Sequence, residues 1–145
     1  MAHENVLTDD ARIAAILRQA RRVAVLGIKP ESRAGEAGHY VPAFLARQGV
    51  EVIPVPTYYP EVNEILGRPV VRHLASVPGP VDVLDVFRRP ADIPAHLEDV
   101  KSLRPRLVWF QLGIRNDDAA EELARAGIPV VQDRCLMAEW RRLVG

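Results

Sequence analysis

A glycine directly after an apolar run is the first feature of this chain that has the chemistry of a binding site. Residues 23–26 are all apolar, Gly27 follows them at once, and Lys29 stands two residues later. This order indicates a buried strand, a glycine turn and then a helix that starts near His39. Nucleotide-binding α/β domains use this arrangement to present backbone N–H groups and a helix dipole to phosphate. The stretch therefore predicts a site for a phosphate-bearing nucleotide.

The other predicted strands end in residues that suit the same site. In an open parallel sheet, ligands bind beyond the carboxyl ends of the strands, where the strand order reverses. Lysine and arginine there pair with phosphates, glycine permits close backbone approach, and proline and phenylalanine supply flat apolar walls. The strand-end residues are Gly27, Ile28, Lys29 and Pro30; Val55, Pro56 and Thr57; Phe87, Arg88, Arg89 and Pro90; Gln111, Leu112 and Gly113; and Asp133, Arg134 and Cys135. We expect one of the paired arginines, Arg88 or Arg89, to face the ligand and the other to face solvent or a carboxylate.

Alternating strands and helices are expected to position these ends. Apolar runs predict strands at 23–26, 51–55, 81–87, 107–110 and 128–131. Helical spacing predicts helices over 8–20, from near 39 to 49, from 92 to about 103, from 117 to 126 and from 136 to 143, with one helical turn at 73–77. This order predicts a three-layer, Rossmann-like α/β fold, in which helices cover both faces of a mostly parallel open sheet. We expect one domain over residues 1–145.

Prolines and capping residues refine the expected helix starts. Proline is best tolerated in the first turn of a helix, so Pro42 places the start of its helix near His39 or Tyr40. By the same reasoning, Asp92 caps a helix that admits Pro94 in its first turn. Asn116 is expected to cap the next helix.

Two common nucleotide motifs are absent. The dinucleotide fingerprint G-x-G-x-x-G needs further glycines after the first strand and an acidic residue at the end of the second, where this chain has Val55 and Pro56. The P-loop pattern G-x-x-x-x-G-K-[ST] is missing as well. These absences disfavour NAD and a P-loop ATPase, although Gly35 and Gly38 keep an NAD(P)-binding enzyme open as an alternative.

Composition narrows the class of partner. The 145 residues carry nineteen basic and nineteen acidic side chains, so no basic excess points to a nucleic acid or a membrane surface. A small molecule or a protein, including a second copy of the chain, is the expected partner. The single cysteine fits a reducing, cytoplasmic setting, and no apolar run resembles a signal peptide or reaches about 18 residues.

Five motifs in order carry a resemblance to a known family. They are Val23-Ala24-Val25-Leu26-Gly27, Val52-Ile53-Pro54-Val55-Pro56, Asp85-Val86-Phe87-Arg88-Arg89-Pro90, Trp109-Phe110-Gln111-Leu112-Gly113 and Asp133-Arg134-Cys135. Together, over roughly residues 20–139, they resemble the small stand-alone CoA-binding domain proteins, whose fold is that of the N-terminal domain of the succinyl-CoA synthetase α subunit. The resemblance implies coenzyme A as the ligand and contacts from Gly27, Ile28, Lys29, Pro30, Val55, Pro56, Phe87 and Arg88. Gln111 and Gly113 complete the predicted site.

No group of residues predicts catalysis or metal binding. Asp82 and Asp85 lie three apart on one strand and point to opposite faces, which is poor geometry for a paired acid and base. The four histidines have no metal-ligand spacing and are expected in solvated or capping roles. Cys135 is expected to be a small buried apolar residue, with a nucleophile or a thiol that exchanges with CoA as the alternative.

These observations predict a non-catalytic module that binds CoA or an acyl-CoA. The resemblance also implies that a synthetase activity needs a phosphohistidine-bearing second domain and a nucleotide-activating partner, and this sequence contains neither. Two alternatives are kept: an NAD(P)-binding enzyme, and a regulatory or structural subunit whose nucleotide pocket is vestigial.

Overall fold

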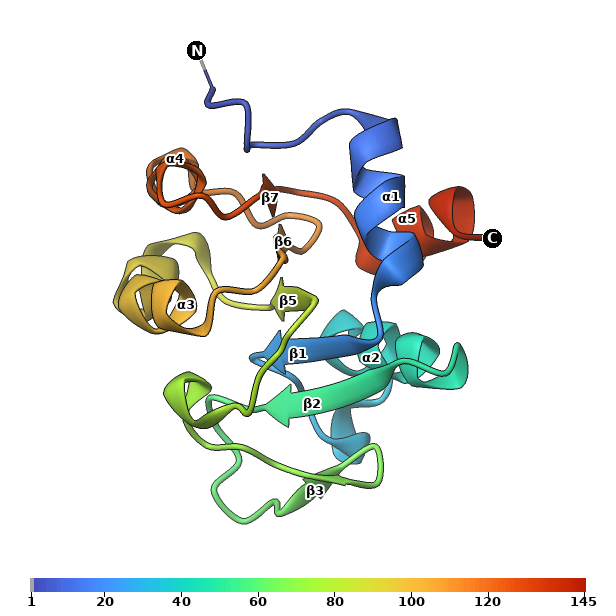
Figure 1. Ribbon diagram of the computed structural model, residues 1–145. Coiled ribbons are helices and arrows are strands. Elements are labelled where there is room, and N and C mark those ends of the chain that lie inside the picture. Colours follow the sequence, from blue (N-terminus) through green and yellow to red (C-terminus); the bar gives the residue numbers. More distant parts are fainter. Residues whose placement is uncertain (1) are drawn as a thin grey trace.

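A five-stranded parallel sheet runs through the middle of the molecule (Figure 1). The computed structural model describes residues 2–145. The strands are β1 (Arg22–Leu26), β2 (Glu51–Val55), β5 (Val83–Val86), β6 (Leu107–Phe110) and β7 (Val130–Val131), in the order β2-β1-β5-β6-β7. Every neighbouring pair is parallel. The predicted parallel α/β fold is therefore confirmed, although β5 and β7 are shorter than the apolar runs that contain them.

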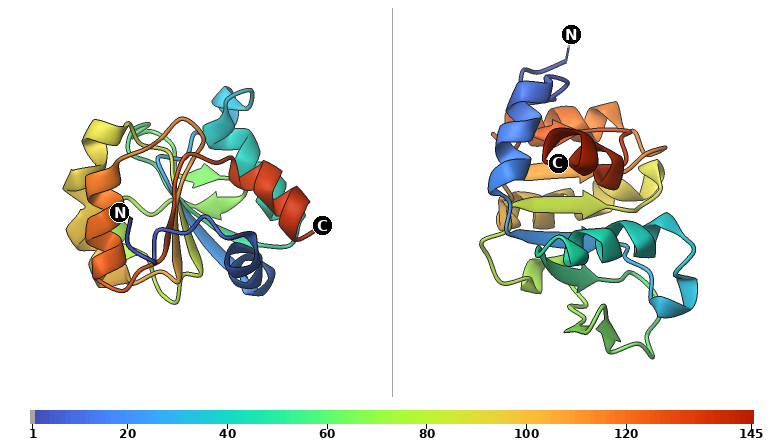
Figure 2. Two further views of the ribbon diagram at one scale, coloured as in Figure 1. Left: turned by 90° about the horizontal axis from the view of Figure 1, so that it is seen from above. Right: turned by 90° about the vertical axis from the view of Figure 1, so that its right-hand side faces the viewer.

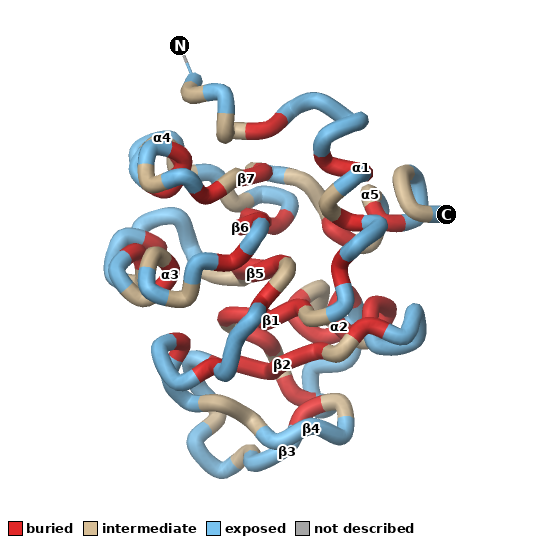
Figure 3. Tube along the Cα trace, in the orientation of Figure 1, coloured by how far each residue is buried: buried red, intermediate tan, exposed pale blue. Residues whose placement is uncertain are grey.

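The α-helices cover the two faces of the sheet, as Figure 2 shows. α1 (Asp10–Gln19), α2 (Ala37–Arg47) and α5 (Leu136–Leu143) lie on one face, and α3 (Leu97–Leu103) and α4 (Asp117–Arg125) lie on the other. Alternate strand residues point to the two faces, so the buried apolar side chains form two clusters. Val25 and Trp109 belong to the cluster under α1, α2 and α5, while Leu26 and Phe110 belong to the opposite one. Most residues of the strands are buried (Figure 3).

The strand order reverses between β1 and β5. From β1 the chain passes through α2 to β2 on one side, and it then returns across β1 to form β5 on the other side. The two connections leave the sheet in opposite directions, so a crevice opens at the carboxyl ends of β1 and β5. Gly27 and Phe87 stand at these two ends.

The start of α2 differs from the prediction. The helix begins at Ala37, so Pro42 lies in its second turn, where it leaves the Gly38 carbonyl without its usual N–H donor. The Lys29 N–H takes that place and donates to the Gly38 carbonyl at 3.0 Å. A contact from outside the helix thus makes the proline acceptable and ties the 28–36 loop to the first turn of α2.

The prediction that Asp92 caps a helix is wrong. The segment Pro90–His96 forms a 3-10 helix that begins after Arg89 and continues into α3. The Asp92 carboxylate instead accepts a hydrogen bond from Arg89 Nε at 2.9 Å. Arg88 and Arg89 thus pair with the Asp92 carboxylate, whose oxygens a helix cap would offer to backbone N–H groups. The other cap is confirmed: the Asn116 side chain accepts from the Ala119 N–H at 3.0 Å.

A short hairpin adds to the loop that follows β2. Its strands β3 (Glu64–Ile65) and β4 (Arg68–Pro69) pair antiparallel within a region for which the sequence predicts no strand. The chain after β4 lies along the edge of β2, since the Val71 N–H donates to the Pro54 carbonyl at 2.9 Å. The helical turn predicted at 73–77 is present as Leu74–Ser76.

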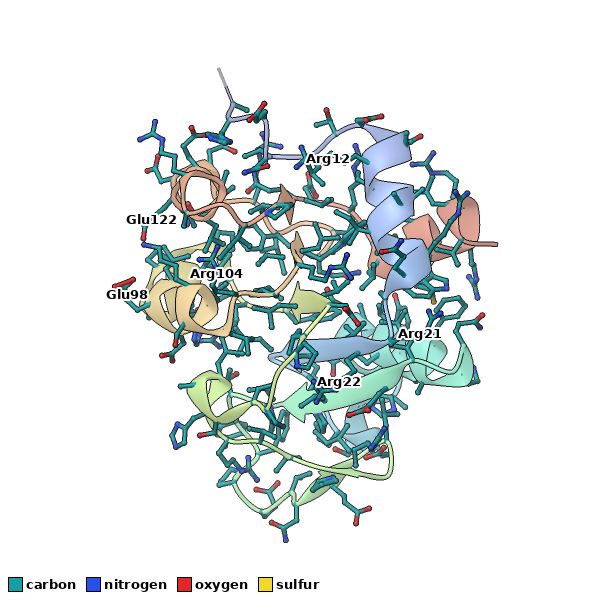
Figure 4. All side chains as sticks on the ribbon, viewed as in Figure 1. Arg12, Arg21, Arg22, Glu98, Arg104 and Glu122 are labelled. Carbon is teal, nitrogen blue, oxygen red and sulfur yellow. The ribbon has the colours of Figure 1, made fainter. Side chains whose placement is uncertain are left out.

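Charged side chains join α3 and α4 on the outside of the molecule (Figure 4). Lys101 of α3 lies 2.6 Å from Glu122 of α4 and 3.5 Å from Glu98 of its own helix.

No helix among residues 2–145 is both long and apolar enough to cross a membrane.

Candidate functional site

Gly27 occupies the point where the strand order reverses. Its φ is +84°, and a Cβ atom at this position would overlap the Phe87 carbonyl oxygen and lie 3.0 Å from the carbonyl carbon. The Gly27 N–H donates to the Val55 carbonyl at 2.8 Å, and the Phe87 N–H donates to the Leu26 carbonyl at 2.8 Å. The carboxyl ends of β2, β1 and β5 therefore meet at one glycine that has no space for a side chain.

The loop after Gly27 is held in place by α2. His39, in the first turn of α2, is buried, and its Nδ1 lies 2.9 Å from the Lys29 carbonyl oxygen. The Lys29 side chain packs its stem against Gly38, and its Nζ lies 3.4 Å from Glu36 Oε1. This places a half-exposed ammonium group at the start of α2, where the helix dipole also favours an anion.

A pocket of about 330 Å³ opens beside the ends of β2 and β5. Its lining includes three strand-end residues named above in the predicted site, Val55, Pro56 and Arg88. The strand-end residue Thr57 also lines it. The other lining residues are ones that the sequence does not single out for the site: Leu26, Arg72, His73, Leu74, His96 and Asp99. A second, more apolar hollow of about 390 Å³ shares several of these residues and extends past Tyr58 and Pro60. The two hollows form one continuous concave region at the strand ends.

Arg88 points into the pocket wall while Arg89 points to solvent. Arg88 donates from Nη1 to Thr57 Oγ1 at 3.2 Å and from Nε to His96 Nε2 at 3.2 Å. Burial and the Arg88 guanidinium both lower the pKa of His96, so this imidazole is neutral and accepts the bond at neutral pH. The Arg89 side chain is 85% exposed and pairs with Asp92. The structure thus assigns different surroundings to two arginines that the sequence leaves equivalent.

The remaining predicted site residues lie outside this pocket. The side chains of Ile28 and Pro30 are buried, so they offer only backbone groups to a ligand. Phe87 is half-buried and packs against the cluster under α1, α2 and α5. Gly113 is exposed, and its N–H donates to Asp133 Oδ1 at 2.7 Å.

Two polar side chains, Gln111 and Asp85, are buried on neighbouring segments of the sheet. Gln111 is 2% exposed, and its Oε1 accepts from the Leu136 N–H at 3.3 Å. Asp85 is fully buried on the neighbouring strand, and burial raises the pKa of its carboxyl well above the usual range. Among residues 2–145, both carboxylate oxygens of Asp85 and the Nε2 of Gln111 are buried without a hydrogen-bond partner. Asp82, by contrast, accepts from the Arg21 and Arg22 N–H groups at 2.7 and 2.9 Å, at the opposite end of the sheet.

Histidine roles match the prediction only in part. His39 is buried and His96 is half-buried beside Arg88, so the expectation of solvated or capping roles is wrong for these two. His39 contacts the Lys29 carbonyl and His96 contacts the Arg88 guanidinium, and no local sequence pattern predicts either contact. Within residues 2–145, no three His, Cys, Asp or Glu side chains are grouped to hold a metal ion.

A larger pocket of about 690 Å³ lies beside β7, between the N-terminal segment and residues 132–134. Its arginines are already engaged: Arg12 donates to the Glu4 carbonyl, Arg115 pairs with Asp117, and Arg134 lies 3.8 Å from Asp10. This pocket lies away from the point where the strand order reverses, so it is not the candidate site.

The sequence matches the family model of the CoA binding domain over residues 21–141, which spans every strand of the sheet. The chain belongs to the CoA binding domain family. This assignment agrees with the resemblance drawn from the five strand-end motifs.

This CoA binding domain is similar to small proteins of about its own length and to one domain of a longer synthetase. A Thermus thermophilus protein of solved structure, cell-free ID.343, is 44% identical, with a TM-score of 0.86 and coverage of 94% of this chain and 99% of that chain. The uncharacterized protein YneT of Bacillus subtilis is 32% identical over 126 residues, which cover 87% of this chain and 90% of YneT. A dinucleotide-forming acetyl-coenzyme A synthetase 1 of Ca. Korarchaeum cryptofilum shares the fold over 79% of this chain and 26% of its own, at 18% identity and a TM-score of 0.64.

Proposed function

We propose that this protein binds CoA or an acyl-CoA at the carboxyl ends of β2, β1 and β5, as a module without catalytic machinery of its own. The observation that carries the proposal is the bare backbone at Gly27, next to a pocket walled by Pro56 and Arg88. A phosphate can approach a backbone that carries no Cβ, and the adjacent cations complement its charge. Membership of the CoA binding domain family supports the choice of ligand.

The pocket suits one end of a CoA molecule. Val55 and Pro56 supply an apolar wall for a flat base, while Arg88 and Arg72 supply guanidinium groups for phosphate oxygens. Lys29 stands on the other side of Gly27 and offers a third cation, at the start of α2. In this proposal the base lies at the β2 side and the pyrophosphate lies over Gly27. The remaining arm then runs along the strand ends.

The Arg88→Ala substitution tests this arrangement by isothermal titration with CoA. A hydrogen bond to a charged group contributes about 1.5–3 kcal/mol, so we expect the Kd to rise roughly 10- to 150-fold. Arg89→Ala is the matched control, because Arg89 is the adjacent arginine and its side chain is 85% exposed. We expect its Kd to stay within about twofold of the wild type.

Other outcomes of the same titration decide against the proposal. Absence of binding at millimolar CoA would overturn it, and equal losses in Arg88→Ala and Arg89→Ala would remove Arg88 from the site. NADH that outcompetes CoA would favour an NAD(P)-binding enzyme. A stable protein partner whose binding is indifferent to CoA, together with no thermal shift by CoA, would favour a structural or regulatory subunit.

A further inference from the structure

Cys135 lies at the same edge of the sheet as Gly27. Trp109 Nε1 donates to the Arg134 carbonyl at 2.7 Å, and the Arg134 N–H lies 3.5 Å from the Phe110 carbonyl. These bonds hold the residue before Cys135 against the carboxyl end of β6. The cysteine is free and half-buried, so its thiol is neither in a disulfide nor sealed in the core.

The thiol stands at the N-terminus of α5. Cys135 is the N-cap residue, its side chain makes no capping hydrogen bond, and the first intrahelical bond runs from the Glu139 N–H to the Cys135 carbonyl at 3.0 Å. The N–H groups of Met137 and Ala138 precede that bond and have no intrahelical acceptor. The start of α5 therefore presents backbone N–H groups to a hydrogen-bond acceptor beside the cysteine.

A buried amide side chain contacts the residue after Cys135. Gln111 is 2% exposed, and its Oε1 is bonded to the N–H of Leu136, the residue after the cysteine. Its Nε2 is buried and has no partner among residues 2–145. An amide N–H₂ in this state is normally matched by a carbonyl or an anion. The arm of CoA carries two amide carbonyls, either of which is an acceptor for such a group, and a terminal thiol.

The distance across the strand ends suits that arm. β1 and β6 are separated by β5 alone, so their ends lie two strand spacings apart, about 10 Å. The arm between the pyrophosphate and the thiol of CoA has the length of about four extended residues, roughly 14 Å. An arm that starts over Gly27 can therefore deliver its sulfur to Cys135.

We propose that Cys135 is a site of thiol–disulfide exchange with the thiol end of the CoA ligand, at the place where Gln111 reaches the start of α5. This inference rests on the proposed function. The Cys135 thiolate attacks one sulfur of a CoA disulfide, so a Cys135–CoA disulfide forms and the original S–S bond breaks. Cys135 is oxidised, and the departing half of the CoA disulfide is reduced and leaves as a thiolate that takes up a proton. A second thiol reverses the step and returns free Cys135.

Intact-mass spectrometry after incubation with CoA disulfide tests the inference. We expect one CoA added per chain, located at Cys135 by peptide mapping, removed by dithiothreitol and absent from Cys135→Ser. Oxidised glutathione is the control, because it is a disulfide without the nucleotide. Binding of the nucleotide end raises the local concentration of the reacting sulfur, so we expect CoA disulfide to react at least about tenfold faster.

The Arg88→Ala and Arg89→Ala variants make the test specific to the bound ligand. We expect Arg88→Ala to slow adduct formation with CoA disulfide and to leave the rate with oxidised glutathione unchanged, while Arg89→Ala changes neither. Absence of an adduct, or equal rates with the two disulfides, would overturn the inference. A parallel CoA titration of the reduced protein separates the two failures: binding without an adduct leaves the proposed function standing, whereas absence of binding rejects both.

Discussion

Replacing Gly27 with alanine is expected to lower the free energy of unfolding by about 2–5 kcal/mol. An alanine must adopt a φ near +84°, which costs roughly 1–2 kcal/mol. Its Cβ must also displace the Phe87 carbonyl, and overpacking of this kind costs typically 1–3 kcal/mol. Both effects act where β1 and β5 separate, so we also expect CoA affinity to fall. Urea unfolding monitored by tryptophan fluorescence measures the stability change.

Gly35→Ala is the matched control for Gly27→Ala. Gly35 lies in the loop that follows the same strand, but a Cβ there meets no atom within 4 Å and its φ is not in the left-handed region. We expect this variant to stay within about 0.5 kcal/mol of the wild type. If the two variants unfold with the same free energy, the close approach of Gly27 to Phe87 is not what holds the strand ends together.

Replacing Asp85 with asparagine is expected to stabilise the protein at neutral pH. Burial raises the pKa of Asp85 in the folded state above its unfolded value. Its contribution to stability is therefore complete below the unfolded pKa, near 4, and is lost as the pH rises toward the folded pKa. Asparagine has no such titration, so the advantage of Asp85→Asn should grow by about 1.4 kcal/mol for each pH unit in that window.

Denaturant unfolding at pH 4, 5, 6 and 7 checks the Asp85 prediction, and Asp82→Asn provides the contrast. The Asp82 carboxylate accepts two backbone N–H bonds, from Arg21 and Arg22. Weakening these charge-assisted bonds is expected to cost about 1 kcal/mol at neutral pH. The two substitutions, three residues apart, should thus have opposite signs. A constant difference between Asp85→Asn and the wild type from pH 4 to 7 would contradict the assigned titration.

Local pattern was most reliable where a segment is buried on both faces. The strands at 51–55 and 107–110 have the predicted bounds, and all of their residues except Glu51 are apolar and buried. The start of α2 and the role of Asp92 were predicted wrongly. At α2 a contact from outside the helix, the Lys29 N–H, satisfies the Gly38 carbonyl, and at Asp92 a local ion pair with Arg89 takes the place of a cap.

Only part of the candidate site could be predicted from the sequence. Gly27 and the residues after β2 and β5 follow from strand order alone, because the carboxyl ends of parallel strands meet at one edge. Arg72, His96 and Asp99 join the pocket through the segments after the hairpin and at the start of α3, and none of them has a local signature. Their CoA contacts, like those of the predicted residues, stay predictions until the titrations are made.

The sequence by itself determined the parallel sheet, the glycine at its switch point and, through five ordered motifs, the CoA binding domain family. Apolar runs and strand-end residues suffice for this because backbone hydrogen bonding and burial leave a strand little freedom. Only the tertiary structure decided that Arg88 and not Arg89 lines the pocket, that Asp85 is fully buried, and that Gln111 reaches the residue beside Cys135. Side-chain surroundings of this kind depend on segments far apart in the chain, which meet only when the helices pack on the sheet.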